Sequence, residues 1–296
     1  MSEVIRQEEG EGFAVFHGDT VEVARGLPDA SVDYSVFSPP FASLYTYSSS
    51  ERDMGNVRDM AEFFEHYRFL VKEQMRVMKP GRLISVHCML LPTSKERHGF
   101  IGLQDFRGDI IRAYQAEGFI FHSEVVIWKD PVTAMQRTKA LGLLWKQIKK
   151  DSAMSRQGIP DYVVTLRKPG ENPNPVSHTA EEFPVDQWQK WASPVWTDID
   201  PSDTLQYQSA REHEDERHIC PLQLSVIRRC INLWSNPGDV VWSPFMGIGS
   251  EGYVALQEKR RFIGAELKRS YFDQAVRNLR LATSQAQASL FGGGAA

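Results

Sequence analysis

The sequence lacks several features that would assign it to a familiar class of protein. Its three cysteines in 296 residues have neither an even count nor the spacing of a metal site, so we expect reduced thiols. No apolar run approaches the roughly 20 residues of a membrane span, and the acidic stretch 1–12 predicts no signal peptide. Internal repeats and nuclease motifs are also missing. We therefore expect a cytoplasmic globular protein, for which an apolar content of 42% is sufficient.

A net basic charge is missing as well, because the formal net charge is −4. The charges are nevertheless distributed unevenly. Segment 129–168 contains nine Lys or Arg and three Asp, whereas segment 171–217 contains three Lys or Arg and eleven Asp or Glu. A basic block in an acidic chain is typical of a phosphate-binding surface or of a solvated helix face. Charge alone leaves both interpretations open.

Alternating strand-like and helix-like segments predict an α/β fold with a mixed, mostly parallel, seven-stranded sheet. The helices are expected at residues 60–78, 106–117, 221–234, 250–257 and 271–282, with Pro221 in the first turn of its helix. The strands are expected at residues 13–17, 32–37, 82–87, 119–129, 161–167, 240–242 and 261–266.

Two short motifs follow predicted strands at opposite ends of the chain. The first is Ser38-Pro39-Pro40-Phe41, and the second runs from Ser243 to Ser250. In open α/β sheets, ligands bind at the carboxyl ends of the strands. Both motifs are therefore candidate parts of a functional site.

The second motif contains Gly247–Gly252, which fits the G-x-G-x-x-G pattern between a strand and a helix. Glu266 ends the next predicted strand, where its carboxylate can accept hydrogen bonds from both hydroxyls of a ribose. Nicotinamide dinucleotides and S-adenosylmethionine both present such a ribose, and a tight turn without a ligand is a third interpretation. Because the motif lies about 50 residues from the C-terminus, earlier strands must complete its sheet, as in a circularly permuted domain.

The Pro-Pro pair of the first motif could simply end a strand, but it also has a chemical interpretation. An exocyclic aromatic amine is a poor nucleophile because its lone pair is delocalised into the ring. The Ser38 hydroxyl and the rigid Pro39 carbonyl could accept hydrogen bonds from such an NH₂ group, and Phe41 could stack on the base. A base in duplex DNA would have to flip out to reach them.

Several motifs in order resemble the β class of amino-group DNA methyltransferases, a permuted family in which the catalytic tetrapeptide precedes the cofactor motif. The resemblance is to its phage-type, solitary branch and covers most of residues 13–281. It implies a Rossmann-like fold, base flipping and methyl transfer from S-adenosyl-L-methionine to an exocyclic amino nitrogen in DNA. The motifs are Gly18-Asp19, Leu27–Asp33, Ser38–Phe41, Met75–Gly81, Val126–Lys129 and residues 218–266.

The resemblance also implies the site residues, with no metal among them. The family usually has Asp where Ser243 stands and Thr where Ser250 stands, so backbone amides of the glycine loop could take over the role of that Asp. Cys220 stands where Lys is more usual. The implied catalytic residues are Ser38, Pro39, Pro40 and Phe41, and the implied cofactor-binding residues are Asp19, Phe37, His218, Cys220, Pro221, Ser243, Phe245, Met246, Gly247, Gly249, Ser250 and Glu266.

Two target bases remain open. Ser-Pro-Pro-aromatic is more often associated with cytosine N4, whereas the longer stretch 38–56 resembles adenine enzymes, so we favour adenine N6 and keep cytosine N4 as the alternative. Methylation at cytosine C5 needs a thiolate nucleophile, and the sequence has no Pro-Cys pair.

The resemblance and the charge distribution also predict a division of the chain into units and a set of partners. The four expected units are a catalytic half at 13–168 with a DNA-facing segment at 129–160, a target-recognition or dimerisation insertion at 169–217, a cofactor half at 218–283 and a flexible tail at 284–296. The Trp residues of the insertion (188, 191 and 196) could equally belong to the core or to a dimer face, and a homodimer is expected. Gln287–Phe291 resembles a peptide that docks on the replication sliding clamp. The expected DNA contacts are Lys129, Arg137, Lys139, Lys146, Lys149, Lys150 and Arg156.

Two more distant interpretations remain. An oxidoreductase with a nucleotide cofactor would leave 38–41 unexplained, and a catalytically inactive DNA-binding homologue is kept open by Ser243. The main interpretation requires that folding place the two motifs side by side, with Phe41 and Gly249 at one cavity.

Overall fold

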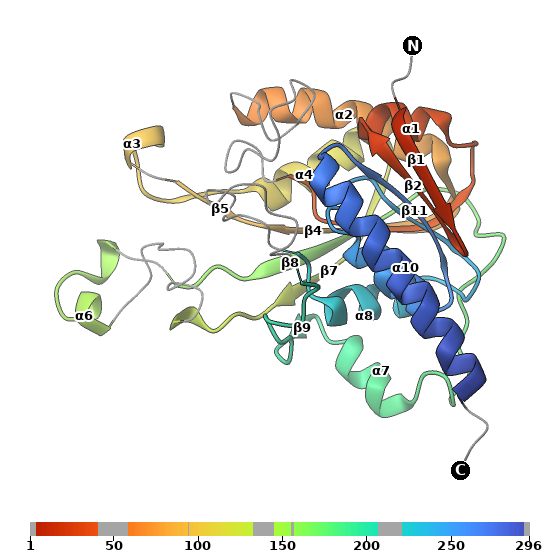
Figure 1. The fold of residues 1–296 in the computed structure, drawn as a ribbon. Helices are drawn as coiled ribbons and strands as arrows, with labels where there is room; N and C mark the ends of the chain where they lie inside the picture. Colours follow the sequence, from red (N-terminus) through yellow and green to blue (C-terminus); the bar gives the residue numbers. More distant parts are fainter. Residues whose placement is uncertain are drawn as a thin grey trace.

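The computed structural model describes residues 4–40, 59–93, 95–132, 145–154, 157–206 and 221–292. Within them the chain forms one nine-stranded sheet covered by helices on both faces (Figure 1). The strands of this sheet are β1 (Val4–Gly10), β2 (Phe13–Gly18), β3 (Val32–Phe37), β4 (Met78–Met89), β7 (Ile120–Ile127), β8 (Asp161–Arg167), β9 (Val195–Trp196), β10 (Val240–Ser243) and β11 (Arg261–Glu266). The helices are α1 (Thr20–Gly26), α2 (Met60–Val77), α3 (Lys95–His98), α4 (Phe106–Ala116), α6 (Trp145–Ile148), α7 (Val185–Trp191), α8 (Leu224–Trp234), α9 (Ser250–Gln257) and α10 (Arg269–Gly292).

The strand order is β1-β2-β11-β10-β3-β4-β8-β7-β9. The seven strands expected from the sequence form the interior of the sheet, and β1 and β9 add one strand at each edge. The five strands from β2 to β4 in this order are mutually parallel, and β8 runs antiparallel to both β4 and β7. The expectation of a mixed, mostly parallel α/β sheet is confirmed.

The central strands are buried because helices cover both of their faces. All six residues of β3 are buried, as expected of a parallel strand between two layers of helices. Residues of α1, α2 and α4 pack in one apolar cluster, and residues of α8, α9 and α10 pack in another. Cys88 and Cys230 are among these core residues, and burial raises the pKa of the Cys230 thiol to about 12. No helix in the described ranges is long and apolar enough to cross a membrane.

The structure corrects two local expectations and adds one strand that the sequence analysis did not predict. Pro221 precedes α8, which begins at Leu224, so it is not in the first turn of that helix. Helix α10 continues to Gly292 rather than ending at residue 282, and the Tyr253 hydroxyl donates to Gln285 on this extension (2.8 Å). The polar N-terminal stretch forms β1, which pairs with β2 and is linked to α10 by ion pairs. The contacts of α10 with β1 and with Tyr253 join residues far apart in sequence, which local composition does not reveal.

The insertion at 169–217 is partly ordered as α7 and β9. β9 pairs in parallel with β7 at the edge of the sheet. Trp196 is buried in the core, whereas about half of the Trp188 side chain is exposed. The core interpretation therefore holds for Trp196.

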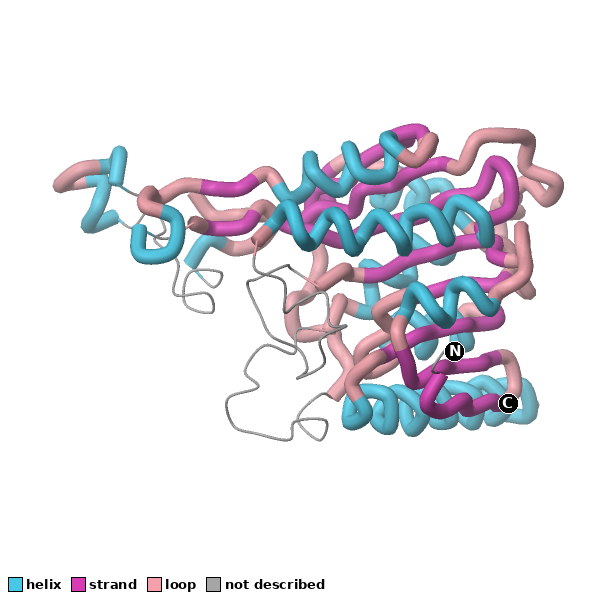
Figure 2. Tube along the Cα trace, turned by 90° about the horizontal axis from the view of Figure 1, so that it is seen from above, coloured by secondary structure: helices cyan, strands magenta, loops and turns pink. Residues whose placement is uncertain are grey.

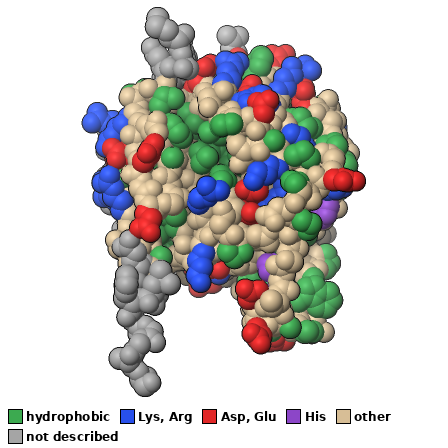
Figure 3. Space-filling view, turned by 90° about the vertical axis from the view of Figure 1, so that its right-hand side faces the viewer, with side chains coloured by type: hydrophobic (Ala, Val, Ile, Leu, Met, Phe, Trp, Pro, Cys, Tyr) green, Lys and Arg blue, Asp and Glu red, His purple; other side chains and the backbone are tan. Residues whose placement is uncertain are grey.

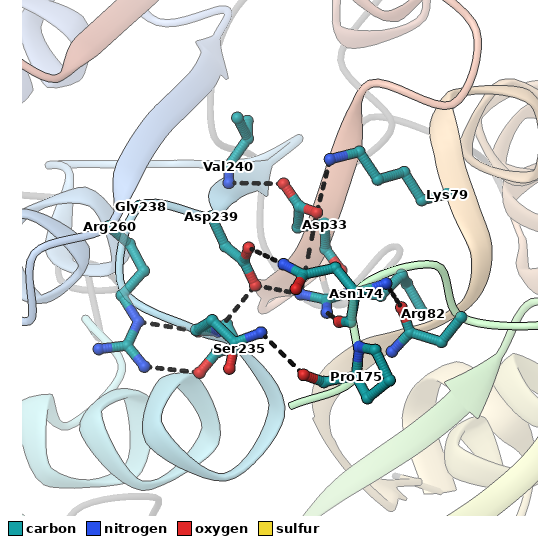
Figure 4. Close-up of polar contacts among 12 residues, drawn as sticks. Asp33, Lys79, Arg82, Asn174, Pro175, Ser235, Gly238, Asp239, Val240 and Arg260 are labelled. Atoms are coloured by element: carbon teal, nitrogen blue, oxygen red, sulfur yellow. Dashed lines mark hydrogen bonds and ion pairs between the residues drawn. The ribbon is translucent and has the colours of Figure 1, made fainter. Parts of the chain in front are cut away.

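Buried charged side chains hold together the amino-terminal edge of the central strands (Figure 4). The Arg82 guanidinium donates to the carboxylate of Asp239, to the Asp33 carbonyl (2.7 Å) and to the Asn174 carbonyl (2.9 Å). The Asp33 carboxylate accepts from Lys79 (2.7 Å) and from the Val240 amide (2.9 Å). This network joins β3, β4 and β10 to the start of the insertion.

Two projections leave the opposite, carboxyl-terminal edge of the sheet. β4 leads into residues 91–104, which contain the short strands β5 (Leu91–Pro92) and β6 (Leu103–Gln104) and α3 between them. β7 leads toward α6, and Figures 1 and 2 show both projections on the same side of the molecule. On the right-hand side of Figure 1, away from the projections, Lys and Arg are interspersed with Asp and Glu (Figure 3).

Candidate active site

Folding places the two sequence motifs next to each other. β3 and β10 are adjacent parallel strands, and the Ser35 hydroxyl donates to the Trp242 carbonyl across them (2.8 Å). The rings of Phe37 and Phe245, one beside each motif, have centroids 5.9 Å apart. Ser38 and the glycine loop therefore start from the same edge of the sheet. Phe41, the last residue of the first motif, lies outside the described residues.

Ser38 begins a chain of polar side chains that the sequence did not reveal. The Ser38 hydroxyl lies 2.9 Å from Nδ1 of His87, and Nε2 of His87 lies 3.2 Å from Oδ2 of Asp161. The Lys129 ammonium contacts the same carboxylate oxygen at 2.5 Å. His87 comes from β4 and Asp161 from the start of β8, and these strands are antiparallel neighbours. No motif or spacing in the sequence links the four residues, so only the sheet register could have identified His87 and Asp161.

The Asp161 carboxyl is almost completely buried. Burial opposes its ionisation, but its contacts with His87 and with the Lys129 ammonium outweigh this effect. The pKa of Asp161 therefore lies below its ordinary value. A carboxylate is consequently held beneath Ser38.

The glycine loop uses its three glycines for different purposes. Gly247 and Gly249 have φ of +52° and +85°, in the left-handed region that favours glycine. A Cβ on Gly247 would meet no atom of the described residues within 4 Å, so this glycine borders open space. A Cβ on Gly252 would lie 2.5 Å from the side chains of Leu279 and Phe262. Gly247 thus borders a candidate ligand position, whereas Gly252 lets α9 pack closely on its neighbours.

Glu266 fixes the glycine loop from the next strand. Its Oε2 accepts from the Gly247 amide (3.0 Å), and its Oε1 accepts from the Lys268 amide (2.7 Å). A carboxylate oxygen can accept more than one hydrogen bond, so these contacts are compatible with binding ribose hydroxyls. Asn278 of α10, which the sequence did not single out, donates to the Ile248 carbonyl (2.8 Å).

The residues of the second motif fit a polar ligand. The hydroxyls of Ser243 and Ser250 are buried, and neither has a hydrogen-bond partner in the part of the chain that the structure describes. Buried polar atoms normally have partners, so these two hydroxyls, the open side of Gly247 and the Glu266 carboxylate are suited to a nucleoside cofactor. The Met246 amide donates to the Ala265 carbonyl (3.0 Å) and keeps the loop against β11.

For the other residues that were expected to bind the cofactor, the structure gives less direct evidence of that role. Asp19 follows β2, next to β11, and caps α1 by accepting from the amides of Val21 (3.0 Å) and Glu22 (3.1 Å). Asp19 lies at the same edge of the sheet as Glu266, which is compatible with a cofactor site at that edge. Its hydrogen bonds to α1 stabilise the start of this helix. His218 and Cys220 lie outside the described residues, and Pro221 is the first described residue after them.

The basic segment is only partly described. The Lys129 ammonium contacts the Asp161 carboxylate, and about a third of the Lys129 side chain is exposed. Lys149 and Lys150 are exposed, and the Lys149 ammonium is 5.2 Å from the centre of the Trp145 ring. Arg137, Lys139 and Arg156 lie outside the described residues, as does the side chain of Lys146. Across the described part of the chain, no cluster of three or more His, Cys, Asp or Glu is arranged to hold a metal ion.

Comparisons with known proteins agree with this arrangement. A family model described as DNA methylase, of the N6/N4 type, matches residues 32–277. A type II methyltransferase of Citrobacter freundii, M.Cfr9I, is 25% identical over 91% of this chain and 88% of its own length. The DNA adenine methyltransferase YhdJ of Escherichia coli K12 is 25% identical over 92% of this chain and 84% of its own length.

Solved structures share the fold. A candidate DNA modification methylase of Thermus thermophilus, solved with S-adenosyl-L-methionine, superposes with a TM-score of 0.66 at 21% identity over 90% of this chain and 94% of its own. The PvuII DNA methyltransferase, named as cytosine-N4-specific, gives a TM-score of 0.65 at 16% identity over 95% of this chain and 93% of its own.

Proposed function

We propose that this chain, which belongs to the N6/N4 family of DNA methylases, methylates the exocyclic N6 of adenine at a specific site in double-stranded DNA. The observation that carries the proposal is the adjacency of β3 and β10, which puts Ser38 and the glycine loop at one edge of the sheet. One loop can then hold the amino group of the base while the other holds the methyl donor. The cofactor is S-adenosyl-L-methionine, as in this family.

Two observations favour different bases. The name of YhdJ specifies adenine, and PvuII methyltransferase is named as cytosine-N4-specific. The Ser-Pro-Pro motif of this chain favours cytosine N4, whereas the residues that follow it resemble adenine enzymes. Both targets are amino groups beside a ring nitrogen, so the same pair of acceptors, Ser38 Oγ and the Pro39 carbonyl, serves either base. Cytosine N4 is therefore the second candidate.

When bound, S-adenosyl-L-methionine supplies an electrophilic methyl group. We propose that Glu266 binds its ribose and that the Gly247–Gly249 backbone and the Ser243 and Ser250 hydroxyls contact its polar groups. Phe37, Phe245 and Met246 form the wall of this site, and Asp19, His218, Cys220 and Pro221 complete it. On the other side, Ser38 and Pro39 orient the amino group, Pro40 fixes the loop and Phe41 stacks on the flipped base.

Two glycine variants are expected to separate cofactor binding from stability. Gly247→Ala places a methyl group in open space at the loop, so affinity for S-adenosyl-L-methionine should fall at least about tenfold, with a stability loss of about 1 kcal/mol. Gly252→Ala forces Phe262 and Leu279 apart, so it should cost about 1–3 kcal/mol of stability with near-normal affinity. Titration calorimetry and urea unfolding measure the two effects. Equal affinities in the two variants would contradict the assignment of Gly247.

The DNA surface is proposed to lie between the two projections. Both leave the edge that carries Ser38, and the exposed Trp145, Lys149 and Lys150 belong to one of them. Arg137, Lys139, Lys146 and Arg156 would extend this basic surface along the phosphate backbone. We further propose that the 169–217 insertion contributes to target recognition, that the protein forms a homodimer and that Gln287–Phe291 docks on the sliding clamp.

The experiment that tests the function is methyl transfer from labelled S-adenosyl-L-methionine to unmethylated DNA, followed by mass spectrometry of the nucleosides. N6-methyladenine is expected, and Pro39→Ala or Phe41→Ala should lower the rate by about 10²-fold because the amino group is misplaced. N4-methylcytosine would establish the second candidate instead. A folded protein that binds both ligands without transferring methyl groups would support the inactive homologue.

A further inference from the structure

A line of polar side chains joins Ser38 to Lys129, whose side chain is 32% exposed. It passes through His87 and Asp161 to Lys129, with separations of 2.9, 3.2 and 2.5 Å. Only 9% of His87 and 4% of Asp161 is exposed, while the residues before and after His87 on β4, Val86 and Cys88, are fully buried. Burying polar groups in such a core is costly unless they are bonded to one another. The mutual contacts of these four residues, which come from four segments, offset part of this cost.

The chemistry of the two ends determines the direction of every hydrogen bond. The lowered pKa of Asp161 makes it a carboxylate, which can only accept, and the Lys129 ammonium can only donate. With a proton on Nε2, which lies 3.2 Å from Oδ2 of Asp161, His87 can donate to this carboxylate. In the neutral ring, Nδ1 then has no proton and accepts from the Ser38 hydroxyl. In this arrangement the lone pairs of Ser38 Oγ can accept from an external donor.

Other charged groups near this strand are paired among themselves. Asp105, Arg107 and Glu124 act electrostatically on Cys88, the residue after His87. Arg107 forms ion pairs with Glu124 (3.0 Å) and Asp105 (3.8 Å). Asp161 contacts His87, and Lys129 contacts Asp161.

We propose that His87, held by Asp161 and Lys129, is a positioning residue that keeps Ser38 Oγ an acceptor for the amino group of the base and receives the proton released on methylation. The proposal rests on the proposed function and deepens it. It also gives Lys129 a role inside the site instead of on the DNA surface.

The proton balance is complete with groups of the site. The amino nitrogen uses its lone pair to form the N–C bond, the electrons of the S–C bond remain on sulfur, and the nitrogen becomes positively charged. One N–H proton then passes to Ser38 Oγ as the Ser38 proton passes to Nδ1 of His87. The resulting imidazolium is stabilised by the Asp161 carboxylate and later loses its proton to solvent. A ring that already carried protons on both nitrogens would donate to Ser38 through Nδ1 and could not take up the released proton.

A double-variant cycle tests the coupling between Ser38 and His87. His87→Asn retains an amide oxygen that can accept from Ser38 but cannot take up a proton. The kcat of His87→Asn should fall by about 10²-fold, with the KM for DNA unchanged. The double variant Ser38→Ala/His87→Asn should be no slower than Ser38→Ala alone. His122→Asn is the matched control, because His122 also lies 2.9 Å from a serine hydroxyl, that of Ser123, but at the surface. Its kcat should equal that of the wild type.

Two further readouts separate positioning from a merely structural role. The acid limb of the kcat profile should be present in the wild type and absent in His87→Asn. In ¹⁵N-histidine NMR spectra of the wild-type protein without DNA or cofactor, His87 should be the Nε2–H tautomer. Additive effects in the cycle, an unchanged acid limb or an Nδ1–H tautomer would overturn the proposal. If the wild type transfers no methyl group, the proposed function fails, while the NMR spectrum still tests the hydrogen-bond chain.

Discussion

Arg82→Met is expected to lower the free energy of unfolding by about 3–5 kcal/mol, because removal of one partner leaves a buried charge unpaired. Arg82 is 2% exposed, and its guanidinium bonds the Asp239 carboxylate and two backbone carbonyls (Figure 4). Methionine approximates its volume but supplies no donor. Among the described residues, two hydrogen bonds to the Asp239 carboxylate would then remain. One comes from the Asn236 backbone amide (2.7 Å), and a longer one comes from the Asn174 side chain (3.4 Å). The variant should also loosen the start of the insertion, which Arg82 bonds directly.

Arg68→Met provides the matched control for this prediction. Arg68 is also an arginine in an ion pair, with Glu117, but its side chain is 62% exposed. Its loss should change stability by at most about 1 kcal/mol. Urea unfolding monitored by circular dichroism measures both variants. If Arg82→Met costs no more than Arg68→Met, the network does not stabilise the sheet.

Glu251→Gln is expected to raise stability at alkaline pH. Burial raises the pKa of the Glu251 carboxyl to about 8, from an ordinary value of about 4.5. Below pH 4.5 the carboxyl is protonated in both the folded and the unfolded chain. As pH rises from 4.5 to 8, only the unfolded chain releases the proton, so the wild type loses on the order of 1.4 kcal/mol per pH unit and roughly 5 kcal/mol in all. Above pH 8 this dependence ends.

The glutamine variant removes this titration while keeping the shape of the side chain. Its stability relative to the wild type should therefore be smallest near pH 4.5 and largest at pH 8 and above. Glu22→Gln is the control, because Glu22 also lies in the first turn of a helix but forms a surface ion pair with Arg25. Its effect should stay within about 1 kcal/mol at every pH. A constant difference between Glu251→Gln and the wild type from pH 5 to 8 would show that Glu251 ionises normally in the folded protein.

The sequence predicted the interior of the fold well because strand and helix patterns there agree with burial. β3 is dominated by apolar side chains, all of its residues are buried, and Pro39 and Pro40 follow shortly after its end at Phe37. β1 and the last turns of α10 were missed for the opposite reason. The polar residues Arg6 and Glu8 are ordered by ion pairs with Asp273 and Arg280, more than 260 positions away.

The residues of the candidate site also fall into those that the sequence could identify and those that it could not. Ser38, Gly247 and Glu266 could be identified because each belongs to a local pattern at the end of a strand. His87, Asp161 and Asn278 could not, because their chemistry depends on which strands and helices are neighbours. Lys129 was identified by its charge, but its bond to Asp161 gives that charge a partner that local sequence could not indicate.

The amino-acid sequence by itself determined the two loop motifs, the strands that carry them and the family resemblance, because backbone conformation and burial pattern are local properties of the chain. Only the tertiary structure decided that β10 lies beside β3, that His87 lies between Ser38 and Asp161, and that Arg82 reaches Asp239. The physical reason is that a hydrogen bond or ion pair acts over a few ångströms, and sheet register alone brings residues so distant in sequence within that range.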